Sequence, residues 1–315
     1  MEKQESKGNL NKGITLFVVV AMSFMATLDS SIVNVVLPVM SEKMDVPLSS
    51  IEWVVAIYSI IICSTLLFFG RVGDILGKTK IFQYGSILFT LASLMCGLCH
   101  SFVPLVICRL IQGIGASAYM ATNQGIIAEM YPKEKRGKAL GILMAAVALG
   151  TMVGPPAGGF ILSVLSWNYI FLINVPIGIV IFLLGTKYLP KSKGNKEKLD
   201  VKGAILLFGG TLLLFGALIE SQQIGFLNPF ILGSILISVI LIFFFVRLEQ
   251  RVEQPLLELN ILKNFQFSIN LFCALLLFIC IAASIIIVPF YLQNVLKLTP
   301  LHTGFFMMIS PLVLA

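Results

Sequence analysis

Long apolar runs separated by short polar loops recur along the whole chain. They predict nine membrane-spanning helices and the start of a tenth, at Ile14–Val39, Ile51–Gly70, Ile81–Cys99, Phe102–Ala128, Gly137–Leu165, Asn168–Leu189, Gly203–Gln222, Asn228–Arg247, Phe267–Tyr291 and from His302 onward. A helix of about 20 apolar residues crosses the hydrocarbon core of a bilayer, which is about 30 Å thick. We therefore expect an all-α polytopic membrane protein whose first span is a transmembrane helix and not a removed signal peptide.

The composition excludes a water-soluble globular protein. Of the 315 residues, 58% are hydrophobic and only 12% are charged, whereas soluble domains carry about 25% charged residues. All six cysteines lie in or at the edge of apolar runs, where a small polarizable side chain packs as a hydrophobe. Cys96 and Cys99 form a C-x-x-C pair without a second pair or a nearby acid, so we expect core packing there and no metal site.

The basic residues predict the orientation of the chain. With the N-terminus in the cytoplasm, nearly all of the 22 Lys and Arg residues fall in cytoplasmic segments; only Lys43 and Lys297 fall outside, and Arg109 lies within a span. This bias follows the positive-inside rule and indicates a cytoplasmic N-terminus. The net charge of +7 is thereby explained by membrane orientation, so no nucleic-acid partner is expected.

Two polar stretches divide the spans into groups. The hydrophilic stretch Pro190–Asp200 follows six spans, and the amphiphilic stretch Leu248–Asn264 follows two more. We therefore expect a six-helix bundle over residues 1–189, a linker with two additional helices over 190–264, and the start of a second bundle over 265–315. The last apolar run reaches Ala315 without flanking charges, which predicts that the chain is a fragment or a truncated gene product.

Two opposite charges are predicted to lie inside the membrane. Asp29 is about 15 Å from the outer end of the first span and Arg109 is about 10 Å from the outer end of the fourth. A charge at such a position costs about 2.5–3.5 kcal/mol on insertion scales and is usually functional. The similar depths favour an ion pair or a shared network. A fixed structural hydrogen bond for Asp29, and an Arg109 side chain that reaches the outer interface, remain as alternatives.

Further polar and small residues are candidate site residues. The polar residues that lie in the same two spans are candidates to line a cavity or contact substrate: Asn34, Gln112, Asn123 and Gln124. The segment after the second span is expected to form a tight cytoplasmic turn at Gly70 and Gly77, with Asp74 capping or attracting a helix N-terminus beside Lys78. In the fifth span, small residues recur every four positions and predict a close helix–helix seam that Pro155 bends or stiffens.

These motifs together resemble those of the major facilitator superfamily, and within it the fourteen-helix drug:proton antiporters. The resemblance rests on the first-span motif from Leu28 to Pro38, the turn, the fourth-span motif, and the antiporter pattern of the fifth span, whose residues are Gly141, Gly150, Gly154, Pro155, Gly158 and Gly159. It implies two six-helix bundles around a central cavity, two extra helices between them, and Gly70, Asp74, Gly77 and Lys78 in a conformational-switch loop. It also implies that Asp29 and Arg109 couple proton movement to substrate.

The leading functional hypothesis is a proton-coupled exporter of amphipathic, cationic drugs or toxic compounds. It would work as a monomer in the cell membrane, take its energy from the proton gradient and need no cofactor or metal. The alternatives are an exporter of a metabolite, siderophore or sugar, and a sensor that does not transport. A membrane enzyme is disfavoured, because His100 and His302 lie near outer ends without acidic neighbours in the sequence; no catalytic residue is assigned.

Overall fold

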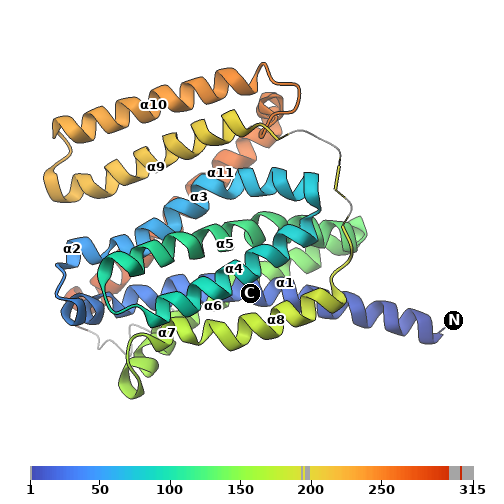
Figure 1. Cartoon of the computed structure of the whole chain (residues 1–315), viewed down its shortest axis with the longest axis horizontal. Coiled ribbons are helices and arrows are strands. Elements are labelled where there is room, and N and C mark those ends of the chain that lie inside the picture. The colour runs from blue at the N-terminus through green and yellow to red at the C-terminus, as the bar shows by residue number, and fades with distance from the viewer. Residues whose placement is uncertain (1, 193, 196–198, 298–305, 307–315) are drawn as a thin grey trace. The chain divides into compact units, whose positions relative to one another are not determined.

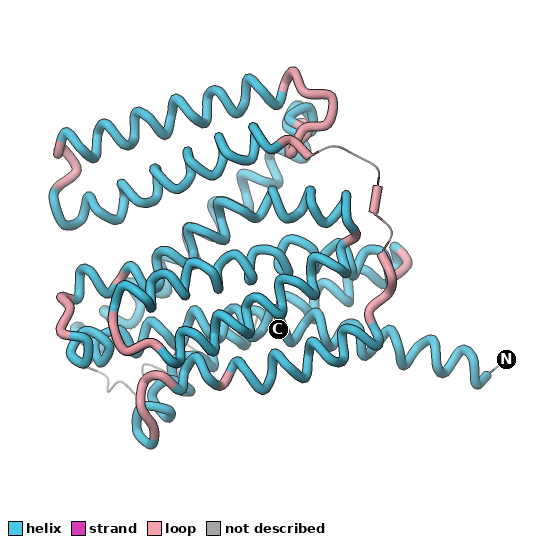
Figure 2. The backbone as a smooth tube through the Cα atoms, viewed as in Figure 1, coloured by secondary structure: helices cyan, strands magenta, loops and turns pink. Residues whose placement is uncertain are grey.

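The computed structural model describes residues 2–192, 194–195, 199–297 and 306. By contacts the chain divides into two compact units, Met1–Leu256 and Leu257–Ala315. Within the described residues every regular element is helical and none is a strand, as Figure 2 shows. The predicted all-α architecture is confirmed.

The first unit contains ten helices in the described ranges. They are α1 (Glu2–Met44), α2 (Leu48–Ile51), α3 (Trp53–Leu76), α4 (Lys78–Leu98), α5 (Phe102–Met130), α6 (Lys133–Val164), α7 (Tyr169–Leu172), α8 (Asn174–Tyr188), α9 (Val201–Ile224) and α10 (Pro229–Glu249). Eight of the helical segments described are long and apolar enough to span a membrane, and they coincide with the first eight predicted spans. The chain is therefore a multi-pass membrane protein.

The second unit is described only in part. It holds a short 3-10 turn (Leu259–Lys263), α11 (Phe265–Phe290) and a π-helical turn (Tyr291–Val295). The ninth predicted span falls in α11, whereas the tenth, from His302, lies outside the described residues apart from Phe306. The boundary between the two units, after Leu256, lies inside the amphiphilic stretch that was expected to precede a second bundle.

Helices of the first unit pack in pairs. The main pairings are α4 with α5, α1 with α6, α3 with α5, and α9 with α10. In Figure 1, α9 and α10 run side by side as a hairpin, and α9 is the member that also contacts α3. The α4–α5 pair is close because glycines meet there: a side-chain carbon added at Gly115 would fall 2.5 Å from the backbone nitrogen of Phe89.

The turn after the second span is shorter than predicted. Gly70 was expected to form part of it, but α3 continues to Leu76, so Gly70 lies inside a helix. Only Gly77 makes the turn, with a φ of 101° that side-chain-bearing residues rarely adopt. A side chain there would also meet the carbonyl oxygen of Ser192, 2.7 Å away, so the linker closes over the turn. The helix is longer because residues 71–76 continue its internal backbone hydrogen bonds instead of entering a loop.

Candidate functional site

A buried polar network lies in the interior of the first unit. The guanidinium Nη1 of Arg109 on α5 donates to Oδ2 of Asp29 on α1 at 2.5 Å and to Oε1 of Gln112 at 2.7 Å. The side chains of both charged residues are 0% exposed. Arg109 therefore does not reach for the outer interface, and the alternative of an interfacial arginine is wrong. The predicted pairing of the two charges is present.

The Asp29 carboxylate accepts hydrogen bonds from three side chains on two helices, α5 and α8. Besides Arg109, its Oδ1 accepts hydrogen bonds from Nε2 of Gln112 at 3.0 Å and from Nδ2 of Asn174 on α8 at 2.7 Å. Gln112 also donates to Oγ of Ser93 on α4 at 2.8 Å. The network thus joins α1, α4, α5 and α8 around one carboxylate.

The arginine is held from its other side by α3. Its Nε donates to the carbonyl oxygen of Val54 at 2.9 Å, and its guanidinium carbon lies 4.2 Å from the centre of the Tyr58 ring. A cation over an aromatic face is attracted by the ring quadrupole, and the attraction is stronger away from water. The side chain is therefore fixed in one position by a carbonyl, a ring, an amide and a carboxylate.

This arrangement depends on the presence of both charges. A buried ion pair is sustained only while both partners are charged and hydrogen-bonded, and loss of one partner leaves an uncompensated charge in the interior.

The other polar candidates do not join the network. Asn123 is buried and donates to Oγ of Ser23 at 2.6 Å, linking α5 to α1 at a separate place. Asn34 and Gln124 are exposed on the first unit. Of the four residues predicted to line a cavity or contact substrate, only Gln112 contacts Asp29 and Arg109.

A second polar cluster lies at the turn between α3 and α4. Nζ of Lys78 pairs with Asp74 at 3.0 Å and with Glu129 on α5 at 2.9 Å. Ser192 of the linker donates to the other oxygen of Glu129 at 3.0 Å. The N-cap of α4 is Gly77 and not Asp74. The Asp74 carboxylate instead binds Lys78, the first residue of α4, four positions further along the chain. That expected cap is wrong.

The small residues of the fifth predicted span lie partly against α1. Gly150, Gly154 and Gly158 all face it: side chains added there would meet Thr27, Ser31 and Ile32. A side-chain carbon added at Gly141 or Gly159 would meet no atom within 4 Å. The helix α6 continues through Pro155. The glycines that recur every four residues therefore contact α1, whereas Gly141 and Gly159 do not take part in this contact.

The described residues contain no group of three or more His, Cys, Asp or Glu side chains able to hold a metal ion. All six cysteines are free. Two of them face each other, with Sγ of Cys99 and Sγ of Cys108 at 3.7 Å, and Cys96 donates to Gln112 from the edge of the network at 3.8 Å.

Sequence reasoning missed Asn174, Tyr58, Ser93 and Glu129. Asn174 is a polar residue inside the sixth predicted span, so a comparison of depths like the one applied to Asp29 and Arg109 would have found it. Glu129 directly follows the fourth predicted span, which was a weaker signal. Tyr58 and Ser93 carry no pattern that separates them from ordinary residues of apolar helices.

Comparison with known proteins agrees with this architecture. Residues 19–315 match the family model described as Major Facilitator Superfamily. Over 307 residues the chain is 34% identical to the riboflavin transporter RibZ of Clostridioides difficile (strain 630), covering 96% of this chain and 66% of that one. Over 290 residues it is 30% identical to the multidrug resistance protein Stp of Mycobacterium tuberculosis (strain CDC 1551 / Oshkosh), covering 91% and 54%.

A solved structure shows the same fold. The crystal structure of the human organic anion transporter MFSD10 (TETRAN) superposes with a TM-score of 0.52 at 15% identity, covering 67% of this chain and 56% of that one. The chain spans 66% or less of the length of the two curated relatives. With a family match that extends over nearly all of its residues, the chain belongs to the Major Facilitator Superfamily, a family of membrane transporters and not of enzymes.

Proposed function

We propose that the protein is a proton-coupled secondary transporter that exports amphipathic, cationic drugs or toxic compounds across the cell membrane. The observation that carries this proposal is the fully buried pair of Asp29 and Arg109, which Gln112 bridges and Asn174 completes. A carboxylate that joins α1 to α5 and α8 in the membrane interior is a group whose protonation changes the packing of the bundle.

The coupling step follows from the charges of the network. With Asp29 ionised, the ion pair is neutral overall and the hydrogen bonds to its carboxylate are in place. When Asp29 takes up a proton, Arg109 loses its counter-ion and this arrangement is destabilised. Alternation between the two arrangements would admit a proton from one side and release it on the other, which can drive a second solute in the opposite direction.

The direction and the setting of transport are part of the proposal. The resemblance of the α6 motif to that of antiporters favours export, and the basic loops favour a cytoplasmic N-terminus in the cell membrane. We place the protein among the fourteen-helix drug:proton antiporters, acting as a monomer, with the cluster at Gly77 and Lys78 as the conformational-switch loop. One relative, Stp, is named a multidrug resistance protein, which supports a drug as cargo.

A second candidate cargo is riboflavin or a similar planar metabolite. The relative at 34% identity, over 96% of this chain, is a riboflavin transporter. The Asp29 network would serve this cargo as well, because it concerns the proton and not the organic solute. The two candidates therefore differ in substrate and share the coupling site.

Transport in everted membrane vesicles that contain the complete gene product tests the proposal. With an imposed pH gradient, wild-type vesicles are expected to accumulate a cationic dye. Asp29→Asn is expected to lose this gradient-driven accumulation, because an amide cannot take up the proton that the carboxylate accepts. Asp45→Asn is the matched control, because it makes the same change at an exposed position at the end of α1. It should transport like the wild type.

The outcomes separate the candidates. Gradient-driven movement of labelled riboflavin without movement of dyes would favour the second cargo and leave the coupling site in place. Gradient-driven transport of either solute that survives Asp29→Asn unchanged would contradict the assigned role of Asp29.

A further inference from the structure

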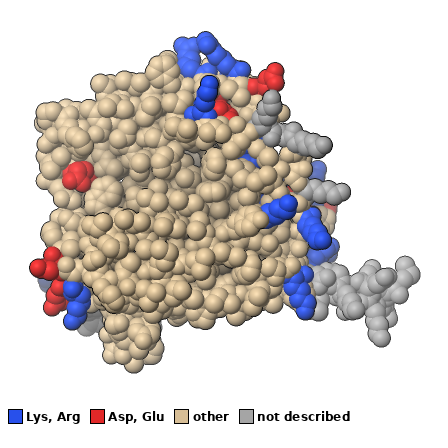
Figure 3. All heavy atoms as spheres, viewed as in Figure 1, with Lys and Arg blue, Asp and Glu red and all other residues tan. Residues whose placement is uncertain are grey.

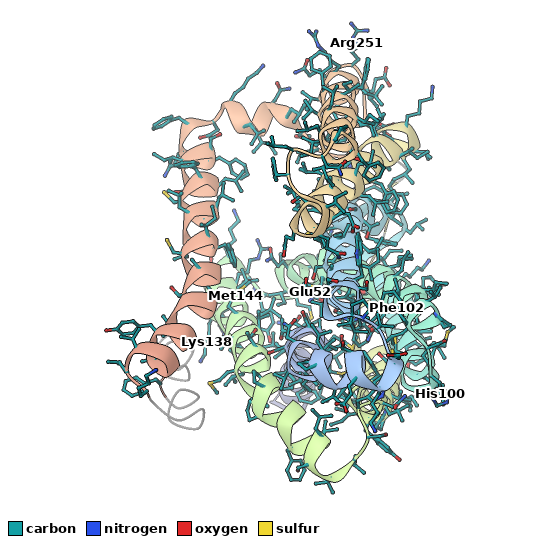
Figure 4. All side chains as sticks on the ribbon, turned by 90° about the vertical axis from the view of Figure 1, so that its left-hand side faces the viewer. Glu52, His100, Phe102, Lys138, Met144 and Arg251 are labelled. Carbon is teal, nitrogen blue, oxygen red and sulfur yellow. The ribbon has the colours of Figure 1, made fainter. Side chains whose placement is uncertain are left out.

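A groove of about 760 Å³ lies along the basic end of the α9–α10 hairpin, within the first unit. Three cationic side chains contribute to its lining: Lys202 from the first turn of α9, Arg247 from the last turn of α10, and Arg251 just beyond that helix. Figure 3 shows Lys and Arg side chains gathered where α10 ends, and Figure 4 labels Arg251 at that end.

The positive charge of the groove is not neutralised from within. None of the described residues that line it is acidic. On α10, Glu249 is buried and, at 3.6 residues per turn, lies on the face roughly opposite the lining residues. Asp200 is engaged as the N-cap of α9, where its carboxylate accepts from the backbone nitrogen of Gly203 at 3.0 Å. Neither of these two acids lines the groove, so the charged side chains of its lining are all positive.

The rest of the groove is apolar and open. Ile205 is 65% exposed, Phe243 is 54% exposed and Phe244 is 55% exposed. In a membrane these surfaces meet acyl chains. The guanidinium carbon of Arg247 lies 5.3 Å from the centre of the Phe243 ring, so one cation is held at the border between the apolar wall and the basic end.

We propose that this groove binds an anionic phospholipid of the leaflet at the basic end of the helices. The three cations would contact the phosphate headgroup, and the exposed aromatic and aliphatic side chains would contact an acyl chain. Basic pockets between transmembrane helices are suited to phosphate-bearing headgroups. A free phosphate ion would use the cations alone and gain nothing from the apolar wall, so the combination favours a lipid.

Binding of defined lipids to the purified chain in detergent tests this site. Cardiolipin and phosphatidylglycerol are expected to bind and to raise the melting temperature, whereas zwitterionic phosphatidylethanolamine and inorganic phosphate are expected to do neither. Each Lys or Arg near a membrane surface contributes about fivefold to anionic-lipid affinity. The triple variant K202Q/R247Q/R251Q should therefore weaken cardiolipin binding, measured by native mass spectrometry, by on the order of 100-fold.

A matched triple variant controls for net charge. K133Q/K135Q/K138Q removes three exposed cations at the start of α6, and it is expected to keep the wild-type affinity. If the groove variant does not fold, the single R251Q variant still tests the site through an expected fivefold loss. Equal lipid binding by the groove variants and the α6 variant would overturn the proposal, and so would equal binding of phosphatidylethanolamine. A melting shift with inorganic phosphate of the same size would replace the lipid site by a phosphate site.

Discussion

Replacing Asp29 by Asn is expected to lower the free energy of unfolding by about 3–5 kcal/mol, the usual cost of removing one partner of a buried ion pair. The structure favours the upper part of this range. Asp29 accepts hydrogen bonds from Arg109, Gln112 and Asn174 at 2.5, 3.0 and 2.7 Å. Asn keeps one acceptor oxygen, and its amide group would point at a donor. Arg109 would remain 0% exposed without a counter-ion.

The partner substitution and the double variant complete a thermodynamic cycle. Arg109→Met leaves a buried carboxylate with only amide donors and should cost about as much as Asp29→Asn. The double variant contains neither charge, and replacement of a whole buried pair by neutral side chains is often close to neutral. Its cost is therefore expected to be smaller than the sum of the two single costs by about 3 kcal/mol or more.

Unfolding of the purified variants in detergent, followed by helical circular dichroism against denaturant, measures all four corners of the cycle. Asp45→Asn provides the control for an identical change at an exposed site and should stay within about 0.5 kcal/mol of the wild type. Costs that add to within about 0.5 kcal/mol would refute the reasoning, because independent sites behave in that way.

Three further outcomes test other parts of the structure. Glu129→Gln should lower stability by only about 0.2–1 kcal/mol in the same unfolding assay, since its pair with the lysine that opens α4 is partly exposed; a loss of 3 kcal/mol or more would contradict this. Gly115→Ala should lower the free energy of unfolding by about 1–3 kcal/mol, because the new carbon would lie 2.5 Å from a backbone nitrogen of α4. Gly159→Ala is the control and should cost little, because its new carbon would meet no atom within 4 Å. Similar costs for the two variants would contradict the close contact of α4 and α5. Mild oxidation should join Cys99 to Cys108, whose sulfurs are 3.7 Å apart, as read by mass spectrometry of linked peptides; a mixture of linkages with other cysteines would argue against this geometry.

The sequence predicts the helices better than their ends. Runs of apolar residues locate the eight spans of the first unit, because a bilayer leaves few alternatives to a continuous helix. The ends depend on tertiary contacts that no local pattern contains. Gly70 is helical because α3 continues to Leu76, and Pro38 lies inside α1, which continues to Met44.

The sequence predicted those site residues whose burial has a large energetic cost. Charges inside apolar spans must be compensated, so Asp29 and Arg109 stood out and their depths suggested a pair. Asn174 and Gln112 supply the other hydrogen bonds to the Asp29 carboxylate, from helices far apart in the sequence. An uncharged amide costs less to bury than a charge, so its presence in an apolar span indicates a site less strongly. The contact of Tyr58 with Arg109 depends on how closely α3 approaches α5, and no sequence pattern predicts it.

The Asp29 network and the basic groove differ in charge and in exposure. The Asp29 network is buried and its opposite charges are paired. The basic groove of α9 and α10 is open and carries charge of one sign, so it is suited to hold a ligand. The hydrogen bond from Thr211 of α9 to Ser64 of α3, at 2.8 Å, ties the hairpin to the six-helix part near its middle. A lipid bound at the basic end, as proposed above, would add a second attachment where the helices meet the headgroups.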